Sequence, residues 1–322
     1  MMGARNILYD RGLFKTQRLP RPVVCVGNLT WGGTGKTPIV RWVVEKLDRE
    51  GLDVALLSRG YGRTAEGLIL SPPDEAEDPH LLGDEPAMMK GSVPSLWAGI
   101  CGDRWLAGNE ILKRGEVDLF IMDDGFQHRK LFRDLDVVVM RTRRSPLEGR
   151  LLPAGAMREP VEGLARADVL ILNETDGDSP KELLDLGRRF HCRIFRVKMV
   201  PGTMMMRSAA GKEKTVCGQG HRAVLLSGIG SPESFRVTAE AAGVVCLEHL
   251  CFPDHHWFND ADLSRAAMAF SRCKADVLLT TEKDWQRMRS LKISLPTATL
   301  GLEVRFREGG DEALLELIRE RL

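Results

Sequence analysis

The sequence lacks cysteine pairs, long apolar runs and an excess of charge of either sign. Its seven cysteines are an odd number and include no C-x-x-C pair, which excludes a disulfide framework and a zinc ribbon. No apolar run approaches the roughly 18–20 residues that span a bilayer. Residues 1–21 also lack the apolar core and the cleavage site of a signal peptide. We therefore expect reduced thiols, a cytoplasmic location and no integral membrane segment.

Length and charge describe an ordinary folded protein. The 322 residues carry 46 Lys+Arg against 45 Asp+Glu and are 43% hydrophobic. At roughly 100–200 residues per domain, this length predicts about two domains. Residues 129–150 hold seven basic residues against three acidic ones, but no aromatic-interleaved or recognition-helix pattern accompanies them. Nucleic acid is therefore a poor candidate partner.

Short β-branched runs alternate with helix-like segments over the first 200 residues. A run at Val23–Gly27, a helical stretch at 37–50 and a second run at Val54–Ser58 form a βαβ unit. Four further strand candidates follow at 95–98, 119–122, 136–140 and 169–172. Such alternation predicts an α/β, doubly wound and mostly parallel sheet with helices on both faces, over residues 1–200.

A second, smaller α/β domain is predicted over residues 201–305. The composition turns polar and rich in Gly and Met around 177–180 and 201–214, and a new alternation then begins. Its strand candidates are 223–227, 244–247 and 276–280, and its helix candidates are 232–242, 260–273 and 284–290. The last helix, within 306–322, packs either with this domain or back on the first one.

The most specific motif is a phosphate loop between the first strand and the first long helix. It comprises Thr30, Trp31, Gly32, Gly33, Thr34, Gly35, Lys36 and Thr37. Its glycines let backbone N–H groups wrap a phosphate, Lys36 neutralises β/γ-phosphate charge, and the Thr37 hydroxyl suits Mg²⁺. Thr30 stands where the general motif has glycine. The motif predicts a P-loop NTPase-like domain that binds ATP and Mg²⁺.

Residues 118–125 contain a strand that ends in acidic residues, which is the usual companion of a phosphate loop. Apolar residues 119–122 are followed by Asp123, which this pattern places beside the loop as a magnesium ligand. Asp124 points elsewhere in an extended strand, so we expect a different, catalytic role for it. The alternative for Asp124 is a turn cap before Gly125.

A phosphate loop alone does not separate kinases from nucleotide switches. Partition-type ATPases place a lysine where this chain has Trp31, and the guanine-reading Asn-Lys-x-Asp element is replaced by Asn173-Glu174-Thr175-Asp176. We expect this strand-ending loop near the base. A GTPase or ATPase switch and a nucleotide-binding membrane scaffold remain as alternative functions.

Several unusual strings then carry a family resemblance. They are SRGYGR at 58–63, GDEP at 83–86, DR at 103–104, DDGFQH at 123–128, LPAGxxREP at 152–160, FxDH at 252–255 and TEKD at 281–284. In this order they resemble the tetraacyldisaccharide 4'-kinase (lipid A 4'-kinase) family. The resemblance implies an ATP-dependent kinase that phosphorylates the 4'-hydroxyl of a tetraacylated glucosamine disaccharide 1-phosphate. It also implies peripheral attachment to the cytoplasmic face of the inner membrane.

The resemblance further implies that Asp84 and His255 form a catalytic dyad, in which the imidazole orients the carboxylate and relays the acceptor's proton. Lys36 and Asp124 complete the predicted catalytic set. From the residues alone, Asp84 is equally a helix N-cap before Glu85-Pro86. The choice of His255 over the adjacent His256 rests on the match to the family's Asp-His pair.

Four residues are candidates for binding the substrate's 1-phosphate and sugar hydroxyls: Arg59, Arg104, His128 and Arg158. For Arg59 and Arg104, surface ion pairs are the alternative. Residues 1–21 are basic and amphipathic, so they either lie on an anionic membrane surface or form a helix packed on the body. Relatives usually carry a longer apolar helix here, which implies weaker attachment or a start site inside the gene.

Overall fold

The computed structural model describes residues 2–75, 78–142, 149–175, 177–207 and 213–322. Asp176 and the middle of the basic stretch, residues 143–148, lie outside the described residues. The chain divides into two compact units. Unit 1 comprises Met1–Met199 and Val304–Leu322, and unit 2 comprises Val200–Glu303. In the part of the chain that is described, no helix has the length and apolarity needed to cross a bilayer.

Unit 1 is a mostly parallel sheet in the strand order β8-β7-β6-β1-β5-β2-β4-β3. Its strands are β1 (Val23–Gly27), β2 (Val54–Ser58), β3 (Ile69–Ser71), β4 (Trp97–Ile100), β5 (Leu119–Asp123), β6 (Leu135–Arg141), β7 (Val169–Asn173) and β8 (Arg193–Arg207). Among the pairings described for unit 1, β3 runs antiparallel to its neighbour, β4, and the others are parallel. β1 lies between β5 and β6, parallel to both. The carboxyl ends of the parallel strands therefore meet at one edge, where loops form ligand sites in such sheets.

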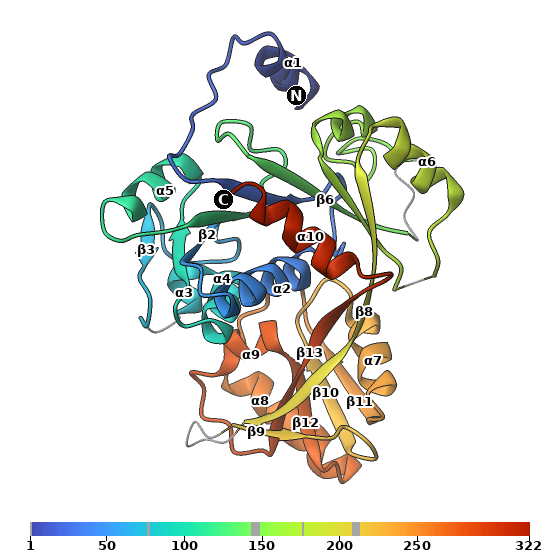
Figure 1. Ribbon diagram of the computed structural model, residues 1–322. Helices are drawn as coiled ribbons and strands as arrows, with labels where there is room; N and C mark the ends of the chain where they lie inside the picture. The colour runs from blue at the N-terminus through green and yellow to red at the C-terminus, as the bar shows by residue number, and fades with distance from the viewer. Residues whose placement is uncertain (1, 76–77, 143–148, 176, 208–212) are drawn as a thin grey trace. The chain divides into compact units, whose positions relative to one another are not determined.

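Helices cover both faces of this sheet, as the alternation of strands and helices predicts (Figure 1). On one face, α2 (Lys36–Arg49), α4 (Asp84–Ser92) and α10 (Gly310–Arg319) share an apolar core with β1, β2 and β5. A second apolar core covers the other face. It is formed by the same three strands with α5 (Arg104–Leu112), the 3₁₀ segment η2 (Val161–Arg166) and α6 (Lys181–Arg189). α10 belongs to unit 1 through Leu314, Leu315 and Ile318, which are buried in the first core. The P-loop NTPase-like α/β fold is confirmed. The short helices α1 (Met2–Asp10) and α3 (Pro79–Leu82) complete the unit.

Unit 2 is a smaller α/β unit with the strand order β11-β10-β12-β13-β8. Its strands are β10 (Arg222–Ser227), β11 (Val245–Cys251), β12 (Val277–Thr281), β13 (Thr297–Phe306) and the second half of β8, on which β9 (Glu213–Val216) pairs antiparallel. Helix α7 (Pro232–Ala241) packs on one face, and α8 (Asp260–Cys273) and α9 (Glu282–Met288) pack on the other.

Strand β8 runs into the polar, Gly- and Met-rich stretch that begins near residue 201. Residues 201–207 continue this 15-residue strand. Along its first half, buried and exposed positions alternate, and Met204 further on is buried in the core of unit 2. Pro201 and Gly202 within β8 are poor strand formers, so burial rather than propensity fixes this strand.

Candidate active site

The phosphate loop joins β1 to α2 through a left-handed glycine. Gly35 has φ 92° and directly precedes Lys36, the first residue of α2. A side chain there would also place its Cβ 2.6 Å from Asn173 Nδ2, so the backbone and its surroundings both require glycine. The unpaired N–H groups of the first turn of α2 thus face the loop, where they favour an anion.

Two asparagines hold the loop in shape. Asn28 Nδ2 donates to Thr34 Oγ1 at 3.1 Å, and Asn173 Nδ2 donates to the Thr34 carbonyl at 3.0 Å. Both asparagines are buried. We expected the loop at 173–176 near the nucleotide base, but the amide of Asn173 is engaged by the phosphate loop. Neither role was predicted, although an asparagine at each strand end was the available signal.

The start of the loop lies against the segment that carries Arg158. Thr30 bridges Met157, and the Trp31 N–H donates to the Ala156 carbonyl at 2.6 Å. Trp31 is 56% exposed, and the Arg158 guanidinium lies 5.4 Å from the centre of its ring. This is within the range of a cation–π contact. The LPAGxxREP string is thereby placed beside the phosphate loop.

Lys36, Asp124 and Arg158 form a charged cluster beside the loop. The β1–β5 register sets Val26 opposite Asp123. Asp124 follows with φ 49° and lies 3.1 Å from Lys36 Nζ. Arg158 Nη1 donates to both Asp124 oxygens, at 2.7 and 2.8 Å.

The electrostatics of Asp124 follow from this cluster. Burial by itself would raise the pKa of its carboxyl, but the charges of Lys36 and Arg158 outweigh burial and lower that pKa below its ordinary value. Asp124 is therefore an ion-paired carboxylate rather than a simple turn cap.

Asp123 and Thr37 are the two predicted magnesium ligands. Asp123 is 2% exposed at the end of β5. The Thr37 hydroxyl donates to Glu85 Oε1 at 3.0 Å, so Glu85 joins a site in which we did not predict it. No group of three or more His, Cys, Asp or Glu suited to a metal occurs among the described residues. Mg²⁺ in phosphoryl-transfer sites needs only one or two protein ligands besides water and phosphate, so this donor set fits it.

Asp84 opens helix α4 in a buried position. It is 3% exposed, and its Oδ1 accepts a hydrogen bond from the Glu85 N–H at 3.0 Å. The N-cap position itself is taken by Gly83, at φ 91°. The N-cap alternative therefore does not describe Asp84, which lies one residue inside the helix.

Three of the substrate candidates lie close enough for their charges to interact. Arg59 is exposed after β2, and Arg104 is buried at the start of α5. Burial, and next the Arg59 charge, lower the pKa of Arg104, while Asp123 and Asp124 oppose this. Burial, and next the Arg104 charge, lower the pKa of His128 to about 4, which keeps its ring neutral. The surface ion-pair alternative does not describe Arg104, because it is buried.

His255 lies in unit 2, in a turn held by a buried ion pair. Its N–H donates to the Gly228 carbonyl at 3.0 Å, and its φ is 59°. Asp284 accepts from the Gly228 N–H at 3.0 Å and pairs with Arg287 at 2.6 Å. The TEKD string therefore supports this turn.

The neighbouring His256 is engaged in packing and a hydrogen bond. Its Nε2 lies 2.8 Å from Asp262 Oδ2, and its ring stacks on Phe252 with centroids 4.8 Å apart. The His255 ring makes a looser contact, with its Nε2 3.8 Å from Asp254 Oδ1.

Comparison with known proteins matches the whole chain to one family. The family model described as Tetraacyldisaccharide-1-P 4'-kinase (LpxK) matches residues 1–322. The chain belongs to the tetraacyldisaccharide 4'-kinase family. The enzyme of that name from Syntrophus aciditrophicus is 35% identical over 333 residues, covering 98% of this chain and 89% of its own. The one from Chlorobaculum parvum is 38% identical over 299 residues, covering 89% and 81%.

A solved structure of the tetraacyldisaccharide 4'-kinase family agrees. The crystal structure of the "apo" form of LpxK from Aquifex aeolicus in complex with ATP matches with a TM-score of 0.77 at 30% identity, covering 99% of this chain and 94% of its own. The resemblance drawn from the sequence strings is confirmed, and the chain is a kinase.

Proposed function

We propose that the chain transfers the γ-phosphoryl group of ATP to the 4'-hydroxyl of a tetraacylated glucosamine disaccharide 1-phosphate, in lipid A biosynthesis. The observation that carries this proposal is the Lys36–Asp124–Arg158 cluster beside the phosphate loop, in a chain that matches the kinase family along its whole length. Phosphoryl transfer depends mainly on positioning and on charge stabilisation, and this cluster supplies both.

Within this function the loop residues 30–37 hold the ATP phosphates. The backbone N–H groups and the start of α2 bind phosphate oxygens, and the Lys36 ammonium neutralises charge on the β- and γ-phosphates. Asp124 holds Lys36 in place before the nucleotide binds, because the two lie 3.1 Å apart. Thr37 and Asp123 would hold Mg²⁺, which supplies further neutralisation of phosphate charge when it is bound.

Asp84 and His255 are the proposed proton-handling pair for the acceptor hydroxyl. The family resemblance carries this pairing, in which the carboxylate, a weak base at its reference pKa of about 3.9, shares proton transfer with an imidazole. Burial of the Asp84 side chain supports this role because it keeps bulk water away from the carboxylate.

Arg104, His128 and Arg59 are the proposed partners of the acceptor's phosphate and hydroxyl groups. Among the described residues, the buried Arg104 Nε and His128 Nε2 atoms have no hydrogen-bond partner. Buried polar atoms are costly to leave unpaired, so these atoms suit a bound ligand.

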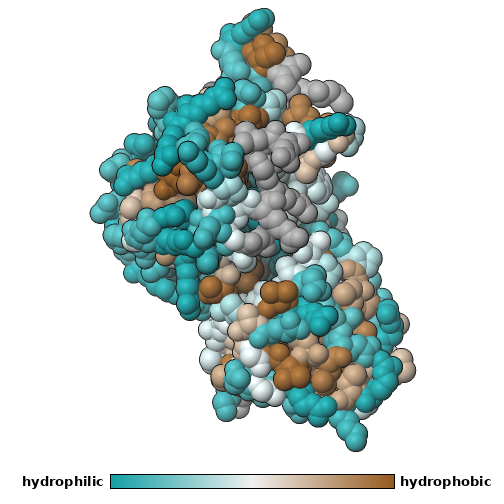
Figure 2. Space-filling view, turned by 90° about the vertical axis from the view of Figure 1, so that its right-hand side faces the viewer, coloured by the Kyte–Doolittle hydropathy of each residue, from teal (hydrophilic) through white to brown (hydrophobic). Residues whose placement is uncertain are grey.

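Peripheral attachment to the cytoplasmic face of the inner membrane is proposed for the N-terminal segment. Its apolar side chains Ile7, Leu13 and Phe14 are exposed, and Figure 2 shows apolar surface on this segment at the top of the view. Basic Arg11 and Lys15 flank them. Apolar groups beside cations suit an anionic lipid surface.

An acceptor assay tests the activity. Purified protein with γ-labelled ATP, Mg²⁺ and the lipid disaccharide should yield labelled lipid. Label released only as free phosphate would favour a nucleotide switch, and no turnover would favour a membrane scaffold. Flotation with anionic liposomes, with and without residues 1–21, tests the attachment.

A further inference from the structure

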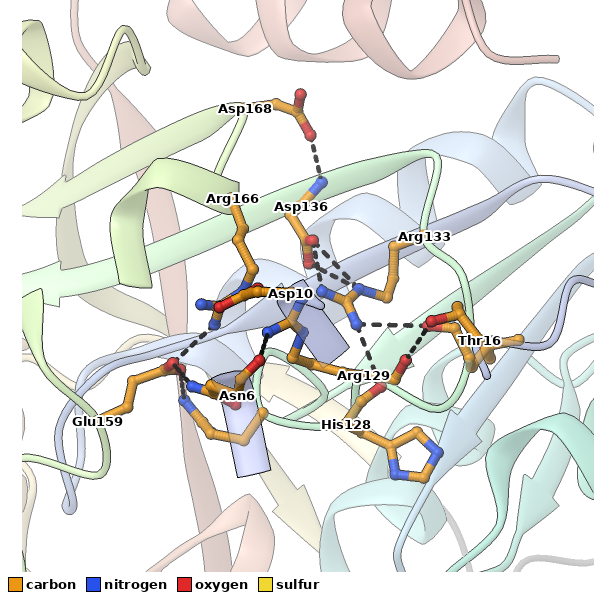
Figure 3. A network of polar contacts seen from close by, with 12 residues as sticks. Asn6, Asp10, Thr16, His128, Arg129, Arg133, Asp136, Glu159, Arg166 and Asp168 are labelled. Carbon is orange, nitrogen blue, oxygen red and sulfur yellow. Dashed lines mark hydrogen bonds and ion pairs between the residues drawn. The ribbon is translucent and has the colours of Figure 1, made fainter. Parts of the chain in front are cut away.

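Glu159 lies completely buried between helix α1 and the phosphate-loop region. Its Oε2 accepts from Asn6 Nδ2 at 2.9 Å and from Arg166 at 2.7 Å, as Figure 3 shows. Its Oε1 accepts from Gln127 Nε2 at 2.8 Å. A buried carboxylate is stable only when its oxygens are paired, and here one of the partners comes from the N-terminal helix.

The contacts continue from Gln127 into the phosphate loop. Gln127 Nε2 also donates to the Asn28 carbonyl at 2.8 Å, so both of its amide hydrogens are used. Asn28 Nδ2 then donates to Thr34 Oγ1 at 3.1 Å. Asn6, Glu159, Gln127, Asn28 and Thr34 therefore form one continuous series of hydrogen bonds, which we term the α1 relay.

Helix α1 is fixed to the same region by a second set of contacts. Arg129 pairs with Asp10 at 2.7 Å and donates to the Asn6 carbonyl at 2.9 Å (Figure 3). Its guanidinium also lies over the Tyr9 ring. The Thr16 hydroxyl donates to the Arg129 carbonyl at 3.1 Å. These contacts seat α1 at one end of the relay without being part of it.

We infer that Glu159 and Gln127 are positioning residues through which the seating of α1 sets the affinity of the phosphate loop for nucleotide. This inference rests on the proposed assignment of residues 30–37 to ATP. Every inner member of the relay is buried, so loss of one partner leaves a polar group unpaired rather than exposed to water. By linkage, nucleotide in the loop also favours the seated position of α1.

A double-mutant cycle on the full-length protein tests the relay. Asn6→Ala removes its α1 end, and Thr34→Val removes its loop end. We expect Asn6→Ala to weaken binding of a fluorescent ATP analogue by about fivefold in the unaltered background but by less than about twofold beside Thr34→Val. In a Thr34→Ser background, which keeps the hydroxyl, the full effect of Asn6→Ala should return. The KM for ATP should rise with the dissociation constant while kcat changes less.

Thr16→Val is the matched control, because it removes a hydrogen bond from the same segment outside the relay. Its effect should be equal in both backgrounds. Faster hydrogen exchange at the amides of 34–37 in Asn6→Ala, and not in Thr16→Val, would support the relay even if Thr34→Val does not fold. Equal effects of Asn6→Ala in both backgrounds, with unchanged exchange, would overturn the relay while leaving the kinase assignment intact. Failure of the unaltered chain to bind the analogue would overturn the nucleotide site itself.

Discussion

The phosphate-loop region of unit 1 and the His255 turn of unit 2 use charge in different ways. Beside the loop, Lys36 and Arg158 share the partly exposed carboxylate of Asp124. At the turn, Asp284 and Arg287 form an ion pair that is almost completely buried. A partly exposed cluster can exchange its partners for a ligand, whereas a buried pair is fixed because separating it leaves a charge without solvent. The difference separates a cluster whose carboxylate is open to solvent and ligands from an ion pair that holds the backbone.

Lys36→Ala is the change expected to have the largest effect on the first region. The loop loses its neutralising ammonium, so kcat should fall by about 10³-fold while the urea unfolding midpoint stays unchanged. Steady-state kinetics and urea denaturation on the same preparation measure both. A kcat within tenfold of that of the unaltered protein would show that Lys36 takes no part in phosphoryl transfer.

His255→Ala tests whether the His255 side chain takes part in the reaction. We expect kcat to fall by about 10²-fold, with a smaller rise in KM, because proton handling acts in the transition state. His256→Ala is the comparison and should mainly lower stability, since His256 bonds Asp262 and stacks on Phe252. The assignment fails if the two variants exchange these behaviours.

The buried ring of His128 predicts a pH dependence of stability in unit 1. Burial and then the Arg104 charge lower its pKa to about 4 in the folded protein, against an ordinary value near 6.5. Between about pH 6.5 and 4 the unfolded chain binds the extra proton, so the free energy of unfolding falls by about 2–3 kcal/mol as the pH drops through this window.

Urea titrations of the unaltered protein and of His128→Gln at pH 4.5, 5.5 and 7 measure this dependence. The variant should lose much of the slope below pH 6.5 and match the unaltered slope above it. An identical slope in both proteins would show that His128 is not the group responsible.

Arg158→Lys tests the finer geometry of the loop cluster. Lysine keeps the charge but loses the planar guanidinium, whose Nη1 bonds both Asp124 oxygens and whose face lies over Trp31. We expect kcat/KM for ATP to fall by about 3–10-fold, as for the loss of one or two hydrogen bonds. Unchanged kinetics would show that the charge of Arg158 is sufficient and that its guanidinium geometry has no role.

Much of unit 1 could be predicted because local signals agree with the fold. The glycines, Lys36 and Thr37 mark a turn into a helix, and apolar residues 119–122 mark a buried strand ending in Asp123. The helix predicted at 37–50 corresponds to α2 (Lys36–Arg49), within one residue at each end.

The parts that could not be predicted depend on contacts between distant segments. The pairing of Thr37 with Glu85, and of Asn173 with Thr34, joins residues that no spacing rule connects. β8 and β13 have weak patterns and are defined by their neighbours in the sheet. Arg104 carries no sequence sign of burial, because its environment comes from charges on three other segments.

The central distinction between a reactive cluster and a supporting ion pair is tested most directly by one matched pair of variants. Asp124→Asn and Asp284→Asn make the same chemical change in the two regions, and kcat and the urea unfolding free energy would be measured for both. We predict that Asp124→Asn lowers kcat by about 10²-fold and the unfolding free energy by no more than about 1 kcal/mol, as for a partly exposed ion pair. Asp284→Asn should lower the unfolding free energy by about 3–5 kcal/mol, with kcat of the folded protein within tenfold. Loss of stability in Asp124→Asn together with loss of kcat alone in Asp284→Asn would contradict the account.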